Sequence, residues 1–113
     1  MTMYSMRLRH CDDVRVGEDI RQLYLERTFE FNFIPSIGMD ICFYKDDYWL
    51  KVTDVEYDFY KQVFNVSVEP DSTGFSDVIH SARFWTENGW SITDYSGDLK
   101  PMLQTNGFIS TKD

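Results

Sequence analysis

The chain has 113 residues, of which 42% are hydrophobic and 17% aromatic, and its net charge is −8 at pH 7. This length suits one domain with a single hydrophobic core, and the aromatic content excludes intrinsic disorder. The acidity disfavours direct binding to nucleic acid or to an anionic membrane, because both are negatively charged.

The negative charge is unevenly distributed along the chain. Residues 1–27 hold five arginines and five acidic residues, whereas residues 28–113 hold six basic and fourteen acidic residues. We expect such an acidic surface to attract basic protein partners, including proteins that themselves bind nucleic acid. The alternative is that the charge serves only solubility, since a net charge of magnitude ~2–8 is common in small domains.

The N-terminal region predicts a short strand followed by a polar connection. Tyr4, Met6 and Leu8 alternate with polar residues, which is the period of a half-buried strand. Residues 10–19 are polar and include Gly17, so we expect a connecting loop there. The first residues lack the apolar segment of a signal peptide, and no apolar run approaches the ~20 residues of a membrane span. We therefore expect a cytoplasmic protein with reduced cysteines.

Alternation of apolar and polar residues continues through residues 20–69. The predicted strands are residues 20–34, 39–44, 48–58 and 62–69, separated by turns at 35–38, 45–47 and 59–61. The apolar positions change from even to odd after Val52, which predicts a β-bulge or bend near Thr53 and Asp54. Cys42 is expected to lie buried in its strand as a small apolar residue.

After Pro70 the pattern changes to helical spacing. Apolar residues recur every three or four positions from Val78 to Trp85, which predicts one helix at about residues 77–88. Ser76 is the expected N-cap, and residues 88–89 suit the C-terminal end. Residues 90–95 are expected to form a short strand or extended arm. Residues 1–95 then form a single globular domain, and residues 96–113 a loosely ordered tail.

These elements predict a β-dominated α+β domain. We expect a small curled antiparallel sheet, or a barrel-like one, of about five to six strands with one helix after the strands.

The sequence shows no pattern that predicts catalysis, a metal or a cofactor. His10, Cys11, Asp12 and Asp13 are adjacent, whereas metal ligands in a local pair are spaced further apart. The serines lack a hydrolase motif and the glycines form no phosphate-binding loop. We therefore expect a non-enzymatic protein without a cofactor.

An acidic row is the most specific candidate for a binding site. Asp54, Glu56 and Asp58 share one parity, which spaces their side chains about 6.8 Å apart on one strand face. The predicted partner-binding residues are Asp40, Asp46, Asp47, Trp49, Asp54, Glu56, Asp58 and Tyr60. Aromatic side chains beside acids suit a partner rich in arginine or lysine. The alternative is that these acids are solvated edge residues that discourage aggregation.

In size, acidity and lack of catalytic residues, the chain resembles small phage-encoded inhibitors of bacterial defence systems, including anti-CRISPR proteins and DNA mimics. The resemblance implies an inhibitor that blocks a basic, nucleic-acid-binding surface on a larger protein. We expect the chain to be a monomer or homodimer. The alternative is a structural or assembly module of a virion or secretion machine that self-associates through edge strands. A small enzyme or ligand-binding barrel would need an enclosed pocket with converging polar groups.

Overall fold

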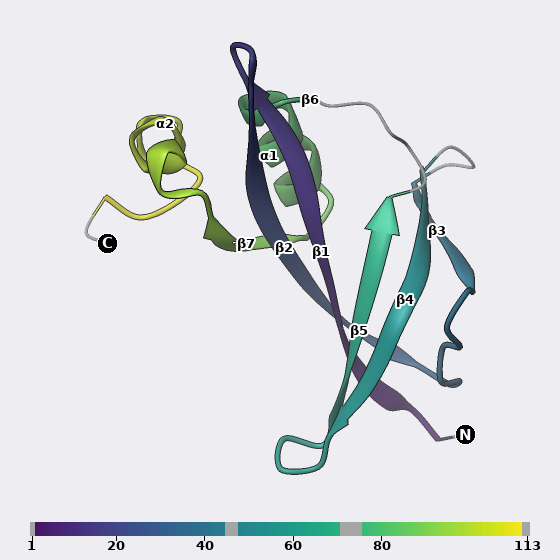
Figure 1. Cartoon of the computed structure of the whole chain (residues 1–113). Helices are drawn as coiled ribbons and strands as arrows, with labels where there is room; N and C mark the ends of the chain where they lie inside the picture. Colours follow the sequence, from purple (N-terminus) through teal and green to yellow (C-terminus); the bar gives the residue numbers. More distant parts are fainter. Residues whose placement is uncertain (1, 45–47, 71–75, 112–113) are drawn as a thin grey trace. The chain divides into compact units, whose positions relative to one another are not determined.

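The computed structural model describes residues 2–44, 48–70 and 76–111 (Figure 1). Its strands are β1 (Tyr4–Val16), β2 (Asp19–Phe31), β3 (Asp40–Tyr44), β4 (Tyr48–Asp58), β5 (Val63–Pro70), β6 (Ser76–Asp77) and β7 (Ser91–Tyr95). Its helices are α1 (Val78–Glu87), the single 3-10 turn η1 (Gly97–Leu99) and α2 (Lys100–Thr105). This content confirms the predicted β-dominated α+β class.

The sheet is mixed and open. Its strand order is β3-β4-β5-β1-β2-β7, with β6 paired to β1. The pairs β3–β4, β4–β5 and β2–β7 are antiparallel, as expected of the sheet, but β1 lies parallel to β5 and to β6. Alternation along a strand is the same in both directions, so the sequence pattern carried no signal for these parallel pairs.

The chain divides into two compact units. Unit 1 comprises Met1–His10 and Arg27–Thr73, and unit 2 comprises Cys11–Glu26 and Gly74–Asp113. The neutral first quarter of the sequence is therefore divided between the units. Unit 1 holds six basic and nine acidic residues, and unit 2 holds five and ten. Charge segregation along the chain does not produce one neutral and one acidic unit.

The core of unit 1 lies on one face of the strands β3, β4, β5 and β1. The buried side chains on this face are Met6, Leu8, Leu50, Val52, Val66 and Val68. A row of stacked rings on β2 and just after it adds to this apolar region. Phe31 lies between Phe29 and Phe33, with ring centroids 5.6 Å and 5.3 Å apart, and Phe29 also contacts Phe43 of β3 at 5.3 Å.

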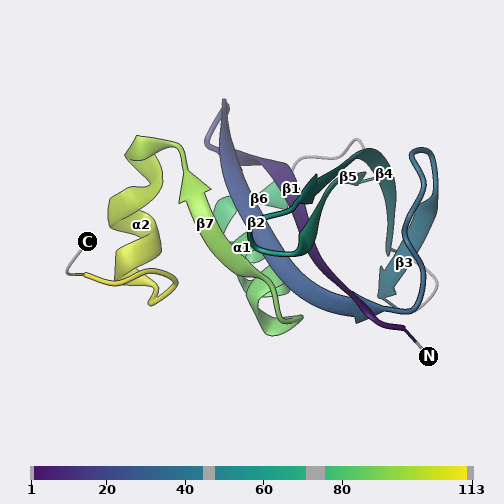
Figure 2. The same cartoon turned by 90° about the horizontal axis from the view of Figure 1, so that it is seen from below.

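Unit 2 has its own set of buried side chains. Its buried apolar side chains are Val14, Leu23, Leu25, Val78, Ala82, Trp85, Trp90, Leu99 and Leu103. The rings of Trp85 and Trp90 meet edge to face, with centroids 5.3 Å apart. Figure 2 shows β7 running beside β2, with α2 after it.

Three expectations about β1, α1 and the C-terminal residues need correction. Residues 10–16 continue β1 instead of forming a loop. The N-cap of α1 is Asp77, not Ser76, because Ser76 pairs with Val14 in β6 and the chain is still extended there. Residues 96–113 were expected to be a loosely ordered tail, but they contain η1 and α2. The side chains of Leu99 and Leu103, four residues apart, are buried.

Candidate protein-binding face

A β-bulge in β4 arranges the candidate binding residues. Val52 pairs with Val68 of β5, and Asp54 pairs with Ser67, so Thr53 is the extra residue that the parity change predicted. The Thr53 hydroxyl donates a hydrogen bond to the Ser67 carbonyl at 3.2 Å. The bulge lets the apolar residues before and after it share the core face of β4, despite their opposite parities.

The same bulge places polar residues of both parities on the opposite face of unit 1, which we call the polar face. In β3 and β4 the polar face carries Asp40, Cys42, Trp49, Lys51, Asp54, Glu56 and Asp58. Trp49 and Lys51 precede the bulge, and the acidic row of Asp54, Glu56 and Asp58 follows it. A strand without the bulge would put the acidic row on the core face with Leu50 and Val52.

The structure thus brings together five of the predicted partner-binding residues. Asp40, Trp49, Asp54 and Glu56 are exposed on the polar face, and Asp58 is half-buried. Asp46 and Asp47 lie outside the described residues. Tyr60 follows the acidic row in the turn between β4 and β5 and is 94% exposed.

Basic residues share the polar face, and sequence reasoning missed their position. Arg7 pairs with Asn65, which pairs with Glu56; Arg9 pairs with Ser67, which pairs with Asp54. Each arginine therefore lies two strands, or about 10 Å between backbones, from a carboxylate of the acidic row. The alternation of Ser5, Arg7 and Arg9 predicted a polar strand face, but its pairing with β5 depends on the parallel contact.

An ion pair lies at the β3 end of this face. Lys51 Nζ is 3.4 Å from Asp40 Oδ1, and both side chains are about half exposed. Pairs of this exposure contribute roughly 0–1 kcal/mol to stability. Asp40 is thus partly neutralised, which leaves Asp54 and Glu56 as the two exposed acids of the acidic row.

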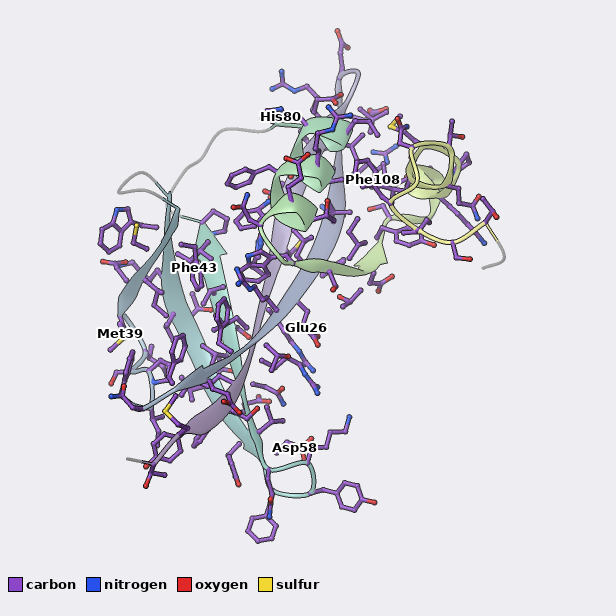
Figure 3. The ribbon with its side chains drawn as sticks, turned by 180° about the vertical axis from the view of Figure 1, so that it is seen from behind. Glu26, Met39, Phe43, Asp58, His80 and Phe108 are labelled. Carbon is purple, nitrogen blue, oxygen red and sulfur yellow. The ribbon has the colours of Figure 1, made fainter. Side chains whose placement is uncertain are left out.

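Asp58 has a structural role in addition to its charge. Its Oδ1 accepts a hydrogen bond from the backbone N–H of Lys61 at 3.0 Å, which closes the turn between β4 and β5. Figure 3 shows Asp58 at this turn. Substitution of Asp58 would alter turn geometry and charge together, so it is a poor test of charge alone.

Asp12 of unit 2 is not the solvated loop residue that the sequence suggested. Its Oδ2 accepts hydrogen bonds from Ser81 Oγ and, at 3.0 Å, from Trp85 Nε1, both on α1. Burial raises the pKa of Asp12, and the two hydrogen bonds oppose that effect. The geometry fits an anchor between β1 and α1, because both donors belong to the helix and the acceptor belongs to the strand.

Cys42 and His10 also differ from expectation. Cys42 is exposed, because its pairing with Trp49 puts it on the polar face, and Cys11 is exposed as well. Partial burial and the neighbouring Asp13 raise the pKa of the Cys11 thiol, which disfavours the reactive thiolate. His10 is only 4% exposed, and burial lowers its pKa to about 4, so it is neutral at pH 7.

Within the described ranges, no group of three or more His, Cys, Asp or Glu side chains could hold a metal ion. In the same part of the chain, no helix is long and apolar enough to cross a membrane. Comparison of the chain with protein-family models, curated proteins and solved structures found no match. The function is therefore argued from the geometry of the chain itself.

Proposed function

We propose that this chain is a non-enzymatic protein-binding domain whose polar face covers a basic surface on a larger protein. The observation that carries the proposal is the bulge at Thr53, which gathers Trp49 and the acidic row on one exposed face. A partly exposed indole on the same face as carboxylates suits a surface rich in arginine, through hydrogen bonds and cation–π contact. Charge complementarity of this kind speeds association and selects the partner.

The partner class follows from the same chemistry. A basic surface that normally holds a nucleic-acid backbone would accept a row of carboxylates, and the net charge of −8 argues against the chain binding nucleic acid itself. We propose an inhibitor of the anti-CRISPR or DNA-mimic type, encoded by a phage and acting in the bacterial cytoplasm. Because Arg7 and Arg9 are positively charged, the resemblance to a nucleic-acid backbone is confined to the β4 side of the polar face.

The test is capture of a partner from a bacterial host lysate, with and without nuclease. The wild-type chain should retain one protein, more of it after nuclease treatment because nucleic acid competes, and less of it at high salt. Asp54→Lys/Glu56→Lys should lose this protein, because the carboxylates would be replaced by like charges facing a basic surface.

The matched control is Glu18→Lys/Glu87→Lys, which gives the same net charge from exposed acids of unit 2. Equal capture by wild type and Asp54→Lys/Glu56→Lys would contradict the proposal. Equal loss in both double variants would assign the binding to net charge rather than to this face.

A second candidate function is self-assembly through an edge strand. β3 ends the strand order in unit 1, and it carries the exposed Cys42. A strand at the end of a sheet offers backbone groups to another copy of the chain. The ion pair between Asp40 and Lys51 at this end adds charge, which disfavours such pairing.

A further inference from the structure

The turn between β4 and β5 exposes two large aromatic side chains. Phe59 is 84% exposed and Tyr60 is 94% exposed, and Tyr57, at the end of β4, is 49% exposed. Contact with water is unfavourable for such rings, and a connection between two strands does not need them. We call residues 57–62 the hairpin tip.

The hairpin tip has a defined conformation. The Tyr57 ring packs against Phe64 of β5, with centroids 4.7 Å apart, and meets the edge of Phe59 at 6.3 Å. Asp58 accepts the hydrogen bond from the Lys61 N–H. Tyr57 therefore connects Phe59 to the apolar face of unit 1. A preorganised aromatic group loses little conformational freedom when it binds.

The backbone of the tip is also unusual for a simple turn. Gln62 has φ 55°, a left-handed conformation that Gly or Asn adopts more readily. A turn optimised only for folding would carry Gly at this position and polar residues at 59 and 60. Strained backbone beside exposed aromatic rings points to a functional constraint.

We infer that the hairpin tip docks Phe59 and Tyr60 into an apolar pocket with a basic rim on the partner protein. The inference rests on the proposed function, because the acidic row leads along β4 to the tip. Exposed Asp54 and Glu56 would face the arginine or lysine side chains of the rim. An anionic bilayer is a poorer fit, since the same carboxylates would be repelled by it.

The test replaces Phe59 or Tyr60 of the full chain by p-benzoylphenylalanine and irradiates the chain in the bacterial host lysate. Ile37, 67% exposed in unit 1, is the matched control position. The expected result is a crosslink from 59 or 60, and not from 37, to one protein. Mass spectrometry should map it to an apolar pocket beside arginine or lysine.

With that protein purified, Phe59→Ser/Tyr60→Ser should weaken binding roughly 30-fold or more, the scale of a binding hot spot. Ile37→Ser should leave binding unchanged. Tyr60→Ser alone is the second variant, because loss of Phe59 removes a ring contact with Tyr57. Urea unfolding of each variant separates loss of binding from loss of fold.

Several results would overturn the inference. These are no crosslink above the Ile37 control, a crosslink to a second copy of the chain, or a crosslink to a polar surface. Sedimentation with phosphatidylcholine–phosphatidylglycerol vesicles, lost in Phe59→Ser/Tyr60→Ser, would favour a membrane instead. If Asp54→Lys/Glu56→Lys abolishes binding and Phe59→Ser/Tyr60→Ser does not, the proposed function stands and only the docking of the tip fails.

Discussion

Asp12 fastens α1 to β1 within unit 2 through its contacts with Ser81 and Trp85. Ser81 and Trp85 are both buried, so neither donor can turn to bulk water if the carboxylate is removed. A buried donor left without an acceptor costs about 1–3 kcal/mol. The stability of this helix contact therefore depends on one acidic residue that lies 69 and 73 positions from its donors.

Asp12→Ala should lower the free energy of unfolding by about 2–4 kcal/mol, because it leaves both buried donors without an acceptor. Asp12→Asn should lower the free energy of unfolding by less, since the amide oxygen of the new side chain can still accept a hydrogen bond. Urea unfolding followed by tryptophan fluorescence measures both. Asp13→Ala, at an exposed neighbour, is the control. Equal stability of Asp12→Ala and Asp13→Ala would contradict the anchoring role.

His10 makes stability depend on pH in the opposite sense to a salt-bridged histidine. Its folded pKa of about 4 lies below the ordinary 6.5, so the unfolded chain binds more protons between these values. Its contribution to stability is therefore complete above pH 6.5 and falls by about 3 kcal/mol as the pH drops towards 4. The raised pKa of Asp12 acts in the opposite direction in acid.

His10→Gln should flatten the pH dependence of the free energy of unfolding between pH 4 and 6.5. This slope is independent of any change that the substitution makes to stability at pH 7. Urea unfolding at a series of pH values measures the slope. His80→Gln, at an exposed side chain of α1, is the matched control. The same slope in His10→Gln and wild type would show that His10 is not kept neutral by the fold.

At the scale of elements, β4 is the segment whose form follows most directly from its residues. Its bounds, Tyr48–Asp58, are those predicted, and the bulge lies where the apolar parity changes. The sequence of β4 alone predicts the bulge, because Leu50, Val52 and Val55 can all face the core only if one extra residue lies between Val52 and Val55. α1 was also predicted, but its first residue depends on the pairing of Ser76 with β1.

Deletion of Thr53 should be tolerated, because the shortened strand alternates regularly and every remaining side chain keeps its face. We expect a loss below about 2 kcal/mol from the changed twist of the strand. Deletion of Lys51 also removes one residue but puts Leu50 and Val52 on opposite faces. Exposure of one of these two core side chains should lower the free energy of unfolding by at least ~1.5–3 kcal/mol. Urea unfolding compares the two, and a Thr53 deletion as damaging as the Lys51 deletion would refute this account of the bulge.

At the scale of the whole molecule, the net charge of −8 opposes association between copies. We predict that the chain sediments as a monomer of 13.4 kDa over a wide range of concentrations in the presence of a reductant. The reductant prevents disulfides between the exposed cysteines. A dimer that grows with concentration and is lost in Ile41→Lys, in β3, would favour self-assembly over the proposed binding function.

Residue alternation along the sequence predicts the position of the bulge and the shared face of the acidic row. These depend on the period of two within one strand, which local residues set. Contacts between distant parts of the chain place Arg7 and Arg9 on the polar face, join Asp12 to α1 and bury His10. Each depends on a partner or neighbour brought from a distant part of the chain, and alternation along a strand contains no information about which distant strand or helix it will meet.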